Sequence, residues 1–142
     1  MYQELVLNND PKSIISETIR TLRTNLQFAS VDKKIKTILI TSSVPGEGKS
    51  FIAANLACAF AQSGSRVLLV DCDIRKGRQH YIFNSHNKSG LSNLLLENVK
   101  EKYMDYIQET RIKNLSVMFR GVTPPNPSEL LGSSKNKELI EI

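Results

Sequence analysis

The sequence predicts an α/β fold, a parallel sheet flanked by helices, and three observations carry this prediction. Short apolar or β-branched runs alternate along the chain with patterns of helical spacing. The runs 36–41 and 67–70 do not alternate between polar and apolar residues, which is typical of strands covered on both faces. A glycine-containing loop joins the first run to a helical pattern. At 142 residues the chain is expected to form a single domain, 1–142, with 1–12 as an extended lead-in.

The first helix is expected to begin at Asp10-Pro11, with Asp10 as its cap and Ser13 as an alternative cap. Apolar residues at helical spacing predict one buried stripe, made of Ile15, Ile19, Leu22 and Leu26. Glu17 and Arg20 lie on the side of the helix opposite this stripe, and Arg23 lies near the edge of that side.

The run 36–41 predicts a buried strand, and the loop 42–48 follows it. A helix is expected to begin near Lys49 and to end at Gly64, where a left-handed cap residue is favoured. Its expected inward residues are Ile52, Ala53, Leu56, Ala57 and Phe60. The run 67–70 predicts a second buried strand.

The pattern is weaker in the rest of the chain. Short helices are expected over 91–97 and 101–108, and a third strand over 115–119. The segment 124–127, Pro-Pro-Asn-Pro, predicts a rigid loop that leads into a helix beginning near Ser128.

Charge and composition narrow the classes of function. The net charge of +5 favours anionic partners, but no basic stripe with interleaved aromatic residues supports nucleic-acid binding. There is neither a membrane-spanning apolar run nor a secretory signal, so we expect a cytoplasmic protein. Cys58 and Cys72 lack metal-type spacing, and both are expected to be buried.

The segment 43–50, Ser-Val-Pro-Gly-Glu-Gly-Lys-Ser, has the features of a phosphate-binding loop between a strand and a helix. Gly46 and Gly48 let backbone N–H groups converge on an anion, and the helix start adds its positive dipole end. Lys49 is expected to bind the β- and γ-phosphates, and the Ser50 hydroxyl to bind Mg²⁺. The usual pattern opens with Gly, whereas this chain has Ser43, and the alternative is a strand–helix turn that binds nothing.

Two carboxylates end the second predicted strand, at Asp71 and Asp73. Side chains two residues apart on an extended segment point the same way, so both can reach one cation. Ligands of open α/β sheets bind at the carboxyl ends of strands. The alternative is a solvated Asp–Asp turn.

The loop together with the strand ending Asp-x-Asp-x-Arg resembles the bacterial tyrosine kinases that govern capsular and exopolysaccharide synthesis, P-loop NTPases related to the partition ATPases. Three further stretches match this family: 17–23, which resembles its Glu-x-x-Arg-x-x-Arg motif, 90–92 and 124–131. Relatives often continue Arg-Lys-Pro where this chain has Arg75-Lys76-Gly77. The resemblance covers nearly the whole chain.

The resemblance implies ATP or ADP and Mg²⁺ as cofactors, with roles assigned by position. The nucleotide-binding residues would be Pro45, Gly46, Glu47, Gly48, Lys49, Ser50 and Phe51. Ser50, Asp71 and Asp73 would hold the metal, and Lys49 and Asp71 would be catalytic, with Asp71 contacting the attacking tyrosine hydroxyl or acting as its base. Arg75 would neutralise phosphate or acidic neighbours.

The resemblance also implies partners. Glu17, Arg20 and Arg23 would contact neighbouring subunits in a homo-oligomeric ring, whereas without the motif they would simply form a solvated helix face. A membrane-anchored activator, the polysaccharide co-polymerase subunit, would hold the kinase at the inner face of the membrane, and its substrates would be tyrosine-bearing proteins. Tyr2, Tyr81, Tyr103 and Tyr106 do not form the family's tyrosine cluster.

The family's Walker B strand would follow the helix that begins near Ser128, so the resemblance implies a chain truncated before Walker B. Two alternatives to a kinase remain open. One is a partition-type ATPase switch, but those relatives usually carry a second Lys where this chain has Ser42 and Ser43. The other is a truncated, non-catalytic fragment that binds nucleotide or forms subunit contacts.

Overall fold

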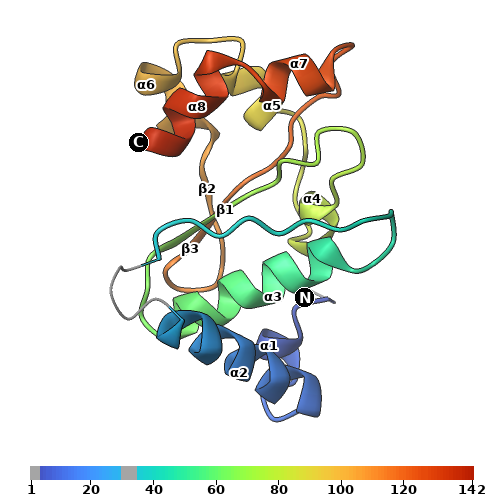
Figure 1. Cartoon of the computed structure of the whole chain (residues 1–142), viewed down its shortest axis with the longest axis vertical. Coiled ribbons are helices and arrows are strands. Elements are labelled where there is room, and N and C mark those ends of the chain that lie inside the picture. The colour runs from blue at the N-terminus through green and yellow to red at the C-terminus, as the bar shows by residue number, and fades with distance from the viewer. Residues whose placement is uncertain (1–3, 30–34) are drawn as a thin grey trace. The chain divides into compact units, whose positions relative to one another are not determined.

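The computed structural model describes residues 4–29 and 35–142, and the chain divides into two compact units (Figure 1). The first unit comprises Met1–Val67 and Ile112–Leu115, and the second comprises Leu68–Arg111 and Ser116–Ile142. Each unit has its own set of buried apolar side chains. The expectation of a single domain stays a prediction.

The first unit begins with a short helix, α1 (Val6–Asn9), where an extended lead-in was expected. The lead-in prediction is therefore wrong for these residues. Burial explains the helix, because Leu5 and Leu7 are 0% and 1% exposed. Asn55, buried within the next-but-one helix, holds this segment: its Nδ2 donates to Glu4 O at 2.8 Å, and its Oδ1 accepts from Leu7 N at 3.5 Å.

Helix α2 (Ile14–Phe28) begins after Ser13, whose side chain accepts the Ser16 N–H at 3.2 Å. The alternative cap was thus correct, and Asp10 does not cap this helix. The predicted apolar stripe is wrong for Ile15 and Leu22, which are 51% and 38% exposed. The buried face carries Ile19, as predicted, and Ser16, which was not predicted.

The rotation of α2 has a physical cause. Arg23 lies between α2 and helix α3, and its Nη1 donates to the carbonyl oxygen of Ala59 at 3.3 Å. The aliphatic stem of an arginine covers apolar surface as well as a small apolar residue does. A pattern that counts only apolar residues therefore misplaces this face.

Helix α3 (Lys49–Gln62) begins and ends where the sequence predicts. Gly48 is its N-cap, and Gly64 follows its end with a φ of +96°. Three of the expected inward residues, Ile52, Ala53 and Phe60, are only half-buried, whereas Leu56 and Ala57 are buried. The most deeply buried face consists largely of small side chains: Ala54, Asn55, Cys58, Ala59 and Ala61.

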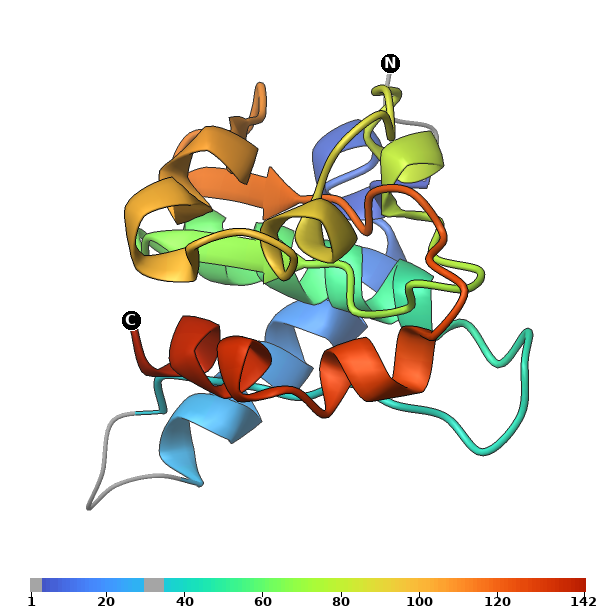
Figure 2. The same cartoon turned by 90° about the horizontal axis from the view of Figure 1, so that it is seen from above.

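The segment 36–41 is not a strand, so the prediction of a buried strand is wrong. The ribbon shows it as a plain extended trace in both views (Figures 1 and 2). Leu39 is 82% exposed, and no backbone hydrogen bond joins these residues to another segment of the described chain. A strand is stabilised by its partner strands, and the described residues supply none here.

The sheet contains β1 (Val67–Val70), β2 (Gln108–Glu109) and β3 (Leu115–Met118), in the order β1-β3-β2. Val67 N donates to Asn114 O and Asp71 N donates to Met118 O, both at 2.9 Å. Both strands advance by four residues between these bonds, so β1 and β3 run parallel, as predicted. β2 pairs antiparallel with β3 and was not predicted. Leu68 is 42% exposed, so the expectation of full burial for β1 is also wrong.

The second unit contains several short helices. They are α4 (Gln79–Ile82), α5 (Leu91–Leu94), α6 (Val99–Lys102), the 3₁₀ helix η1 (Tyr103–Tyr106), α7 (Pro127–Leu131) and α8 (Ser134–Glu141). The predicted helix 91–97 is confirmed in shortened form, and the helix expected near Ser128 begins at Pro127. The predicted bounds 101–108 are wrong, because α6 begins at Val99, a 3₁₀ helix follows it and Gln108 belongs to β2. Helix α4 was not predicted.

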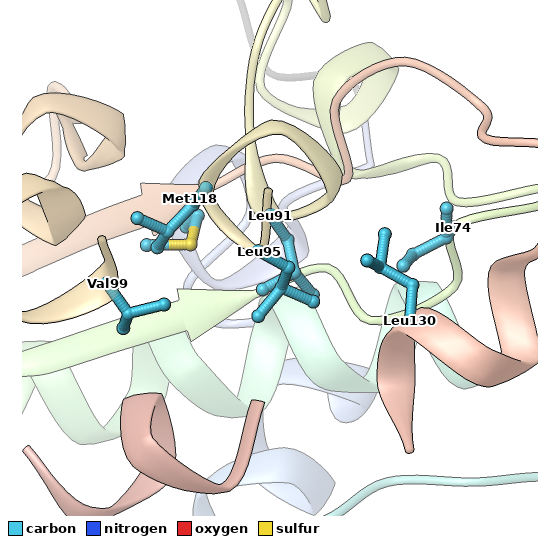
Figure 3. Close-up of a cluster of buried hydrophobic side chains, with 7 residues drawn as sticks. Ile74, Leu91, Leu95, Val99, Met118 and Leu130 are labelled. Carbon is cyan, nitrogen blue, oxygen red and sulfur yellow. The ribbon is translucent and has the colours of Figure 1, made fainter. Parts of the chain in front are cut away.

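Figure 3 shows a cluster of buried hydrophobic side chains, in which Ile74, from the loop after β1, lies next to Leu130 of α7. Its members are Ile74, Leu91, Leu94, Leu95, Val99, Met118 and Leu130. Ile74 is 1% exposed, so the cluster anchors the loop that carries the two aspartates. This anchoring links the core of the second unit to the candidate site.

Two remaining expectations concern cysteine and the membrane. Cys58 is buried as expected, but Cys72 is exposed, so its predicted burial is wrong. No helix among the described residues is long and apolar enough to cross a membrane.

Candidate functional site

The loop before α3 has the backbone geometry of an anion-binding turn. Gly46 and Gly48 adopt φ values of +86° and +87°. No heavy atom lies within 4 Å of the Cβ that either glycine lacks, so the requirement for glycine comes from the backbone conformation alone. Pro45 and the two glycines thus form the turn that the sequence predicts.

Lys49, Ser50 and Phe51 form the first turn of α3, and all three side chains are half-buried. The first bond of the helical ladder runs from Ile52 N to Gly48 O at 2.9 Å. The amides of these three residues therefore precede the ladder and lie at the positive end of a fourteen-residue helix. This arrangement suits a phosphate group.

Glu47 lies in the same loop, and its side chain turns back on the loop itself. Its Oε2 accepts the amide of Ser43 at 2.9 Å and the amide of Val44 at 3.3 Å. Ser43, which replaces the usual first glycine, is therefore held by the carboxylate of Glu47, the fifth residue of the motif. Sequence reasoning assigned Glu47 only to nucleotide contact and missed this bond.

Asp71 lies at the carboxyl end of β1 in the second unit and is only 6% exposed. Its Oδ1 accepts the amide of Asp73 at 3.2 Å, and its Oδ2 accepts the amide of Gln79 at 3.1 Å. Burial raises the pKa of the Asp71 carboxyl, the two backbone hydrogen bonds oppose this shift, and the neighbouring charge of Asp73 adds to it.

Asp73 is half-buried, and its Oδ1 accepts the amide of Lys76 at 2.9 Å. Both aspartates therefore bind amides of the turn that follows β1, and the chain leaves strand geometry directly after Val70. Gly77 packs over Asp71 so closely that a Cβ on this glycine would lie 2.4 Å from both carboxylate oxygens. Glycine at position 77 is thus required by contact with Asp71.

Arg120 is a charged residue of this region that sequence reasoning missed. It follows β3, and its Nη1 donates to Ile74 O at 3.1 Å and to Thr123 Oγ1 at 2.7 Å. Its charge lowers the pKa of Asp71, which partly offsets the effect of burial. Its position directly after a predicted strand was the signal that could have identified it.

His80 lies in α4 and is 8% exposed, with its ring against Tyr81 at a centroid distance of 4.0 Å. Burial lowers the pKa of His80, and the charge of Arg120 lowers it further. Arg75, which was expected to neutralise phosphate or acidic groups, donates from Nη2 to Ser128 Oγ at 3.1 Å.

The loop after β3 is locked by hydrogen bonds to the segment 87–93. This segment contains the stretch 90–92, which resembles the kinase family. Asn87 and Gly121 exchange two hydrogen bonds, of 2.8 and 2.9 Å. Ser92 Oγ donates to Val122 O at 2.6 Å. Gly121 has a φ of +79°, and a Cβ there would lie 2.4 Å from Asn93 Oδ1. This lock fixes the backbone that carries Arg120.

The three residues of the expected subunit interface lie on α2. Arg20 Nη1 contacts Glu17 Oε1 at 2.5 Å and also donates to Pro11 O at 2.7 Å. Arg23 binds α3 as described above. Only Glu17 has a largely exposed side chain, with 67% of its surface accessible. The interface stays a prediction.

The residues present fit a phosphate and a magnesium ion. The turn at Gly46 and Gly48 and the following helix start suit an anion, and Lys49 adds a cation. Ser50, Asp71 and Asp73 offer only oxygen ligands, which Mg²⁺ prefers. Lys49 and Ser50 belong to the first unit and the aspartates to the second, and their sharing of one ion stays a prediction. No group of three or more His, Cys, Asp or Glu side chains in the described ranges is arranged to hold a metal.

The sequence of this chain is similar to those of known proteins. Residues 38–126 match the family described as the CobQ/CobB/MinD/ParA nucleotide binding domain. Over 139 residues the chain is 48% identical to the tyrosine-protein kinase YwqD of Bacillus subtilis, a match that covers 98% of this chain and 58% of YwqD. It is 40% identical over 137 residues to the tyrosine-protein kinase wzc of Salmonella typhimurium, covering 96% of this chain and 19% of that protein.

Solved structures also resemble this chain. The kinase domain of the Escherichia coli tyrosine kinase ETK superposes with a TM-score of 0.88 at 37% identity, covering 97% of this chain and 53% of that one. The chimerical protein CapA2B2 superposes with a TM-score of 0.90 at 48% identity, covering 99% of this chain and 61% of that one. The chain thus spans little more than half the length of YwqD, of the ETK kinase domain and of CapA2B2.

Proposed function

This chain belongs to the CobQ/CobB/MinD/ParA family of nucleotide-binding domains, and on this premise we propose that it is the nucleotide-binding part of an ATP-dependent protein-tyrosine kinase. Its fold is that of the P-loop kinase domains with which it superposes. The observation that carries the proposal is the glycine turn leading into Lys49 and Ser50, within a sequence 48% identical to a protein named as a tyrosine-protein kinase.

Lys49 and the first turn of α3 would bind the triphosphate. Gly46 and Gly48 direct backbone amides toward the anion, and Lys49 neutralises charge on its outer phosphates. Bound Mg²⁺ would supply further charge neutralisation on the phosphate oxygens. Ser50 contributes a hydroxyl ligand, and Asp73 contributes a carboxylate, directly or through water.

Asp71 would contact the tyrosine hydroxyl that attacks. A carboxylate is a weak base toward a phenol, whose pKa is about 10. Burial raises the pKa of the Asp71 carboxyl, and its two backbone hydrogen bonds oppose this shift. Its two backbone hydrogen bonds also fix its orientation. Positioning and charge neutralisation would therefore contribute more to the rate than proton removal does.

Several finer assignments belong to the same proposal. A membrane-anchored activator subunit would hold the protein at the cytoplasmic face of the membrane, where it acts in capsular or exopolysaccharide synthesis. The motif Glu17, Arg20, Arg23 supports assembly into a homo-oligomer through α2. In the structure Arg20 and Arg23 bind within the chain, so ring contacts would have to share or replace these bonds.

Nucleotide binding is the first quantity to measure. The affinity for Mg²⁺–ADP and Mg²⁺–ATP would be determined by calorimetry for the wild type, for Lys49→Ala and for Lys88→Ala, a matched loss of one exposed lysine. We expect Lys49→Ala to weaken binding at least about tenfold, because it removes a charge-assisted contact with phosphate. Lys88→Ala should bind as the wild type does. Equal binding by all three proteins would reject the site.

Phosphotransfer is tested separately, with a tyrosine-rich acceptor and the cytoplasmic tail of a candidate activator. Phosphate on tyrosine, detected by intact mass and lost in Lys49→Ala, would establish the kinase. Lys49-dependent binding without transfer would favour the second candidate, a nucleotide-binding fragment without catalysis. The unpaired extended segment 36–41 is the observation that favours this candidate.

A further inference from the structure

We propose that Glu47 is a positioning residue that braces the phosphate-binding loop from within, an inference that rests on nucleotide binding by this loop as proposed above. Glu47 is one of eight residues of the motif 43–50 and its only acidic one. A carboxylate beside an anion site is unfavourable, because like charges repel and the effect grows as water is excluded. The position of this side chain therefore needs a physical account.

The hydrogen bonds provide one. The side chain of Glu47 folds back across the turn, and a single oxygen, Oε2, accepts the amides of Ser43 and Val44 at 2.9 and 3.3 Å. These are the last two amides before Pro45, which has no N–H to offer. The bonds connect the start of the loop, at residues 43 and 44, to residue 47, and the left-handed Gly46 lies between them in the chain.

The brace has two effects. It ties down a segment that contains two glycines and a run of exposed residues, and ordering such a segment otherwise costs conformational entropy at the moment of binding. It also directs the carboxylate toward two backbone amides that precede the glycine turn. The negative charge is thus matched by N–H donors of the loop rather than left facing the phosphate.

Ser43 gains significance from this contact. It stands where the usual motif has glycine, and its amide makes the shorter of the two bonds to Glu47. The brace offers a way to hold the start of the loop without the first glycine. Position 43 and position 47 therefore act together in this chain.

The test separates the brace from the charge by two substitutions at one position. Glu47→Gln removes the charge but keeps an oxygen that accepts amide hydrogen bonds, whereas Glu47→Ala removes both. We expect Glu47→Ala to weaken Mg²⁺–ADP binding about tenfold and Glu47→Gln to stay within about threefold of the wild type. Equal losses in the two variants, or tighter binding by Glu47→Ala, would overturn the proposal.

Controls keep this result distinct from loss of the fold and from failure of the proposed function. Glu101→Ala removes an exposed acidic residue on α6 and should leave nucleotide affinity unchanged. All variants should show the melting temperature of the wild type to within a few degrees, because the loop is exposed. Failure of Lys49→Ala to weaken binding would reject the site itself rather than the brace.

A second measurement requires no nucleotide. Amide hydrogen exchange of Ser43 and Val44 should be slowed in the wild type and in Glu47→Gln, and accelerated at least about fivefold in Glu47→Ala, because the acceptor is lost. Unchanged exchange of both amides in Glu47→Ala would contradict the brace, whatever the nucleotide affinities show.

Discussion

The two cysteines differ in their surroundings, and their reactivity should differ accordingly. The pKa of both thiols is raised, that of Cys58 to about 11 by burial and that of Cys72 by desolvation and by the neighbouring charge of Asp71, but only Cys72 is exposed. Because a reagent must reach the thiolate, an aromatic disulfide reagent at pH 8 should label Cys72 of the native protein faster than Cys58. Cys72→Ser should abolish this fast reaction, and Cys58→Ser should leave it intact.

The sign of the pH dependence follows from the same value. The folded-state pKa of Cys58 lies above its usual value of 9.0, so the neutral thiol is favoured by folding. Its contribution to stability is complete below pH 9 and is lost as the pH rises through about 11. Rapid labelling of Cys58 at pH 8 without denaturant would contradict the buried position.

Gly121 and Gly132 make a matched pair for testing steric demand. Gly121 has a φ of +79° and no room for a Cβ next to Asn93 and Ser92. Gly132 has an ordinary helical φ of −78°, and the nearest atom to its missing Cβ lies 3.3 Å away. We expect Gly121→Ala to lower the free energy of unfolding by about 2–4 kcal/mol and Gly132→Ala to change it by less than about 1 kcal/mol. Urea denaturation measures both, and equal effects would show that the loop relaxes.

At the scale of the element, helix α2 shows which side chains hold it. Ile19 is 3% exposed and Ile15 is 51% exposed, one turn apart. Ile19→Ala should cost about 2–4 kcal/mol, because it leaves a cavity at a buried position, and Ile15→Ala should cost about 0.5 kcal/mol or less. Chemical denaturation of both variants tests the observed rotation of the helix. A larger cost at Ile15 would restore the stripe that the sequence predicts.

The elements also show what sequence patterns can predict. Helix α3 and strands β1 and β3 were predicted close to their observed positions, because glycine and apolar runs mark such boundaries locally. The run 36–41 has the same composition as a strand, yet it is not one here. Apolar and β-branched side chains favour a buried strand, but a strand forms only where another segment of the chain pairs with it.

The candidate site also has some features that the sequence predicts and others that it does not. Lys49, Ser50 and the two glycines follow from a local motif, and the structure gives them the expected helix start and backbone conformations. The bonds of Glu47 were not predictable, since they depend on how the backbone turns, whereas the position of Arg120 directly after a predicted strand was a signal in the sequence. Side-chain periodicity carries no information on such contacts.

At the scale of the whole molecule, backbone pairing predicts which regions are protected from solvent exchange. The amides of Val67 and Asp71 bond to neighbouring carbonyls at 2.9 Å, whereas the amides of 36–41 bond to no other described segment. We expect the amides of 36–41 to exchange with deuterium orders of magnitude faster than those of Val67 and Asp71. Exchange followed by mass spectrometry measures this difference. Slow exchange within 36–41 would show that a partner strand forms in solution.

The double attachment of Asp71 changes how its alleles should be interpreted. An inactive Asp71 allele carries two lesions at once, the loss of a carboxylate and the release of the turn between Asp73 and Gln79. A genetic screen can separate them. Second-site suppressors that map to the turn itself, around Gly77, would report a defect of shape, whereas an allele that no change in the turn rescues would report a defect of chemistry.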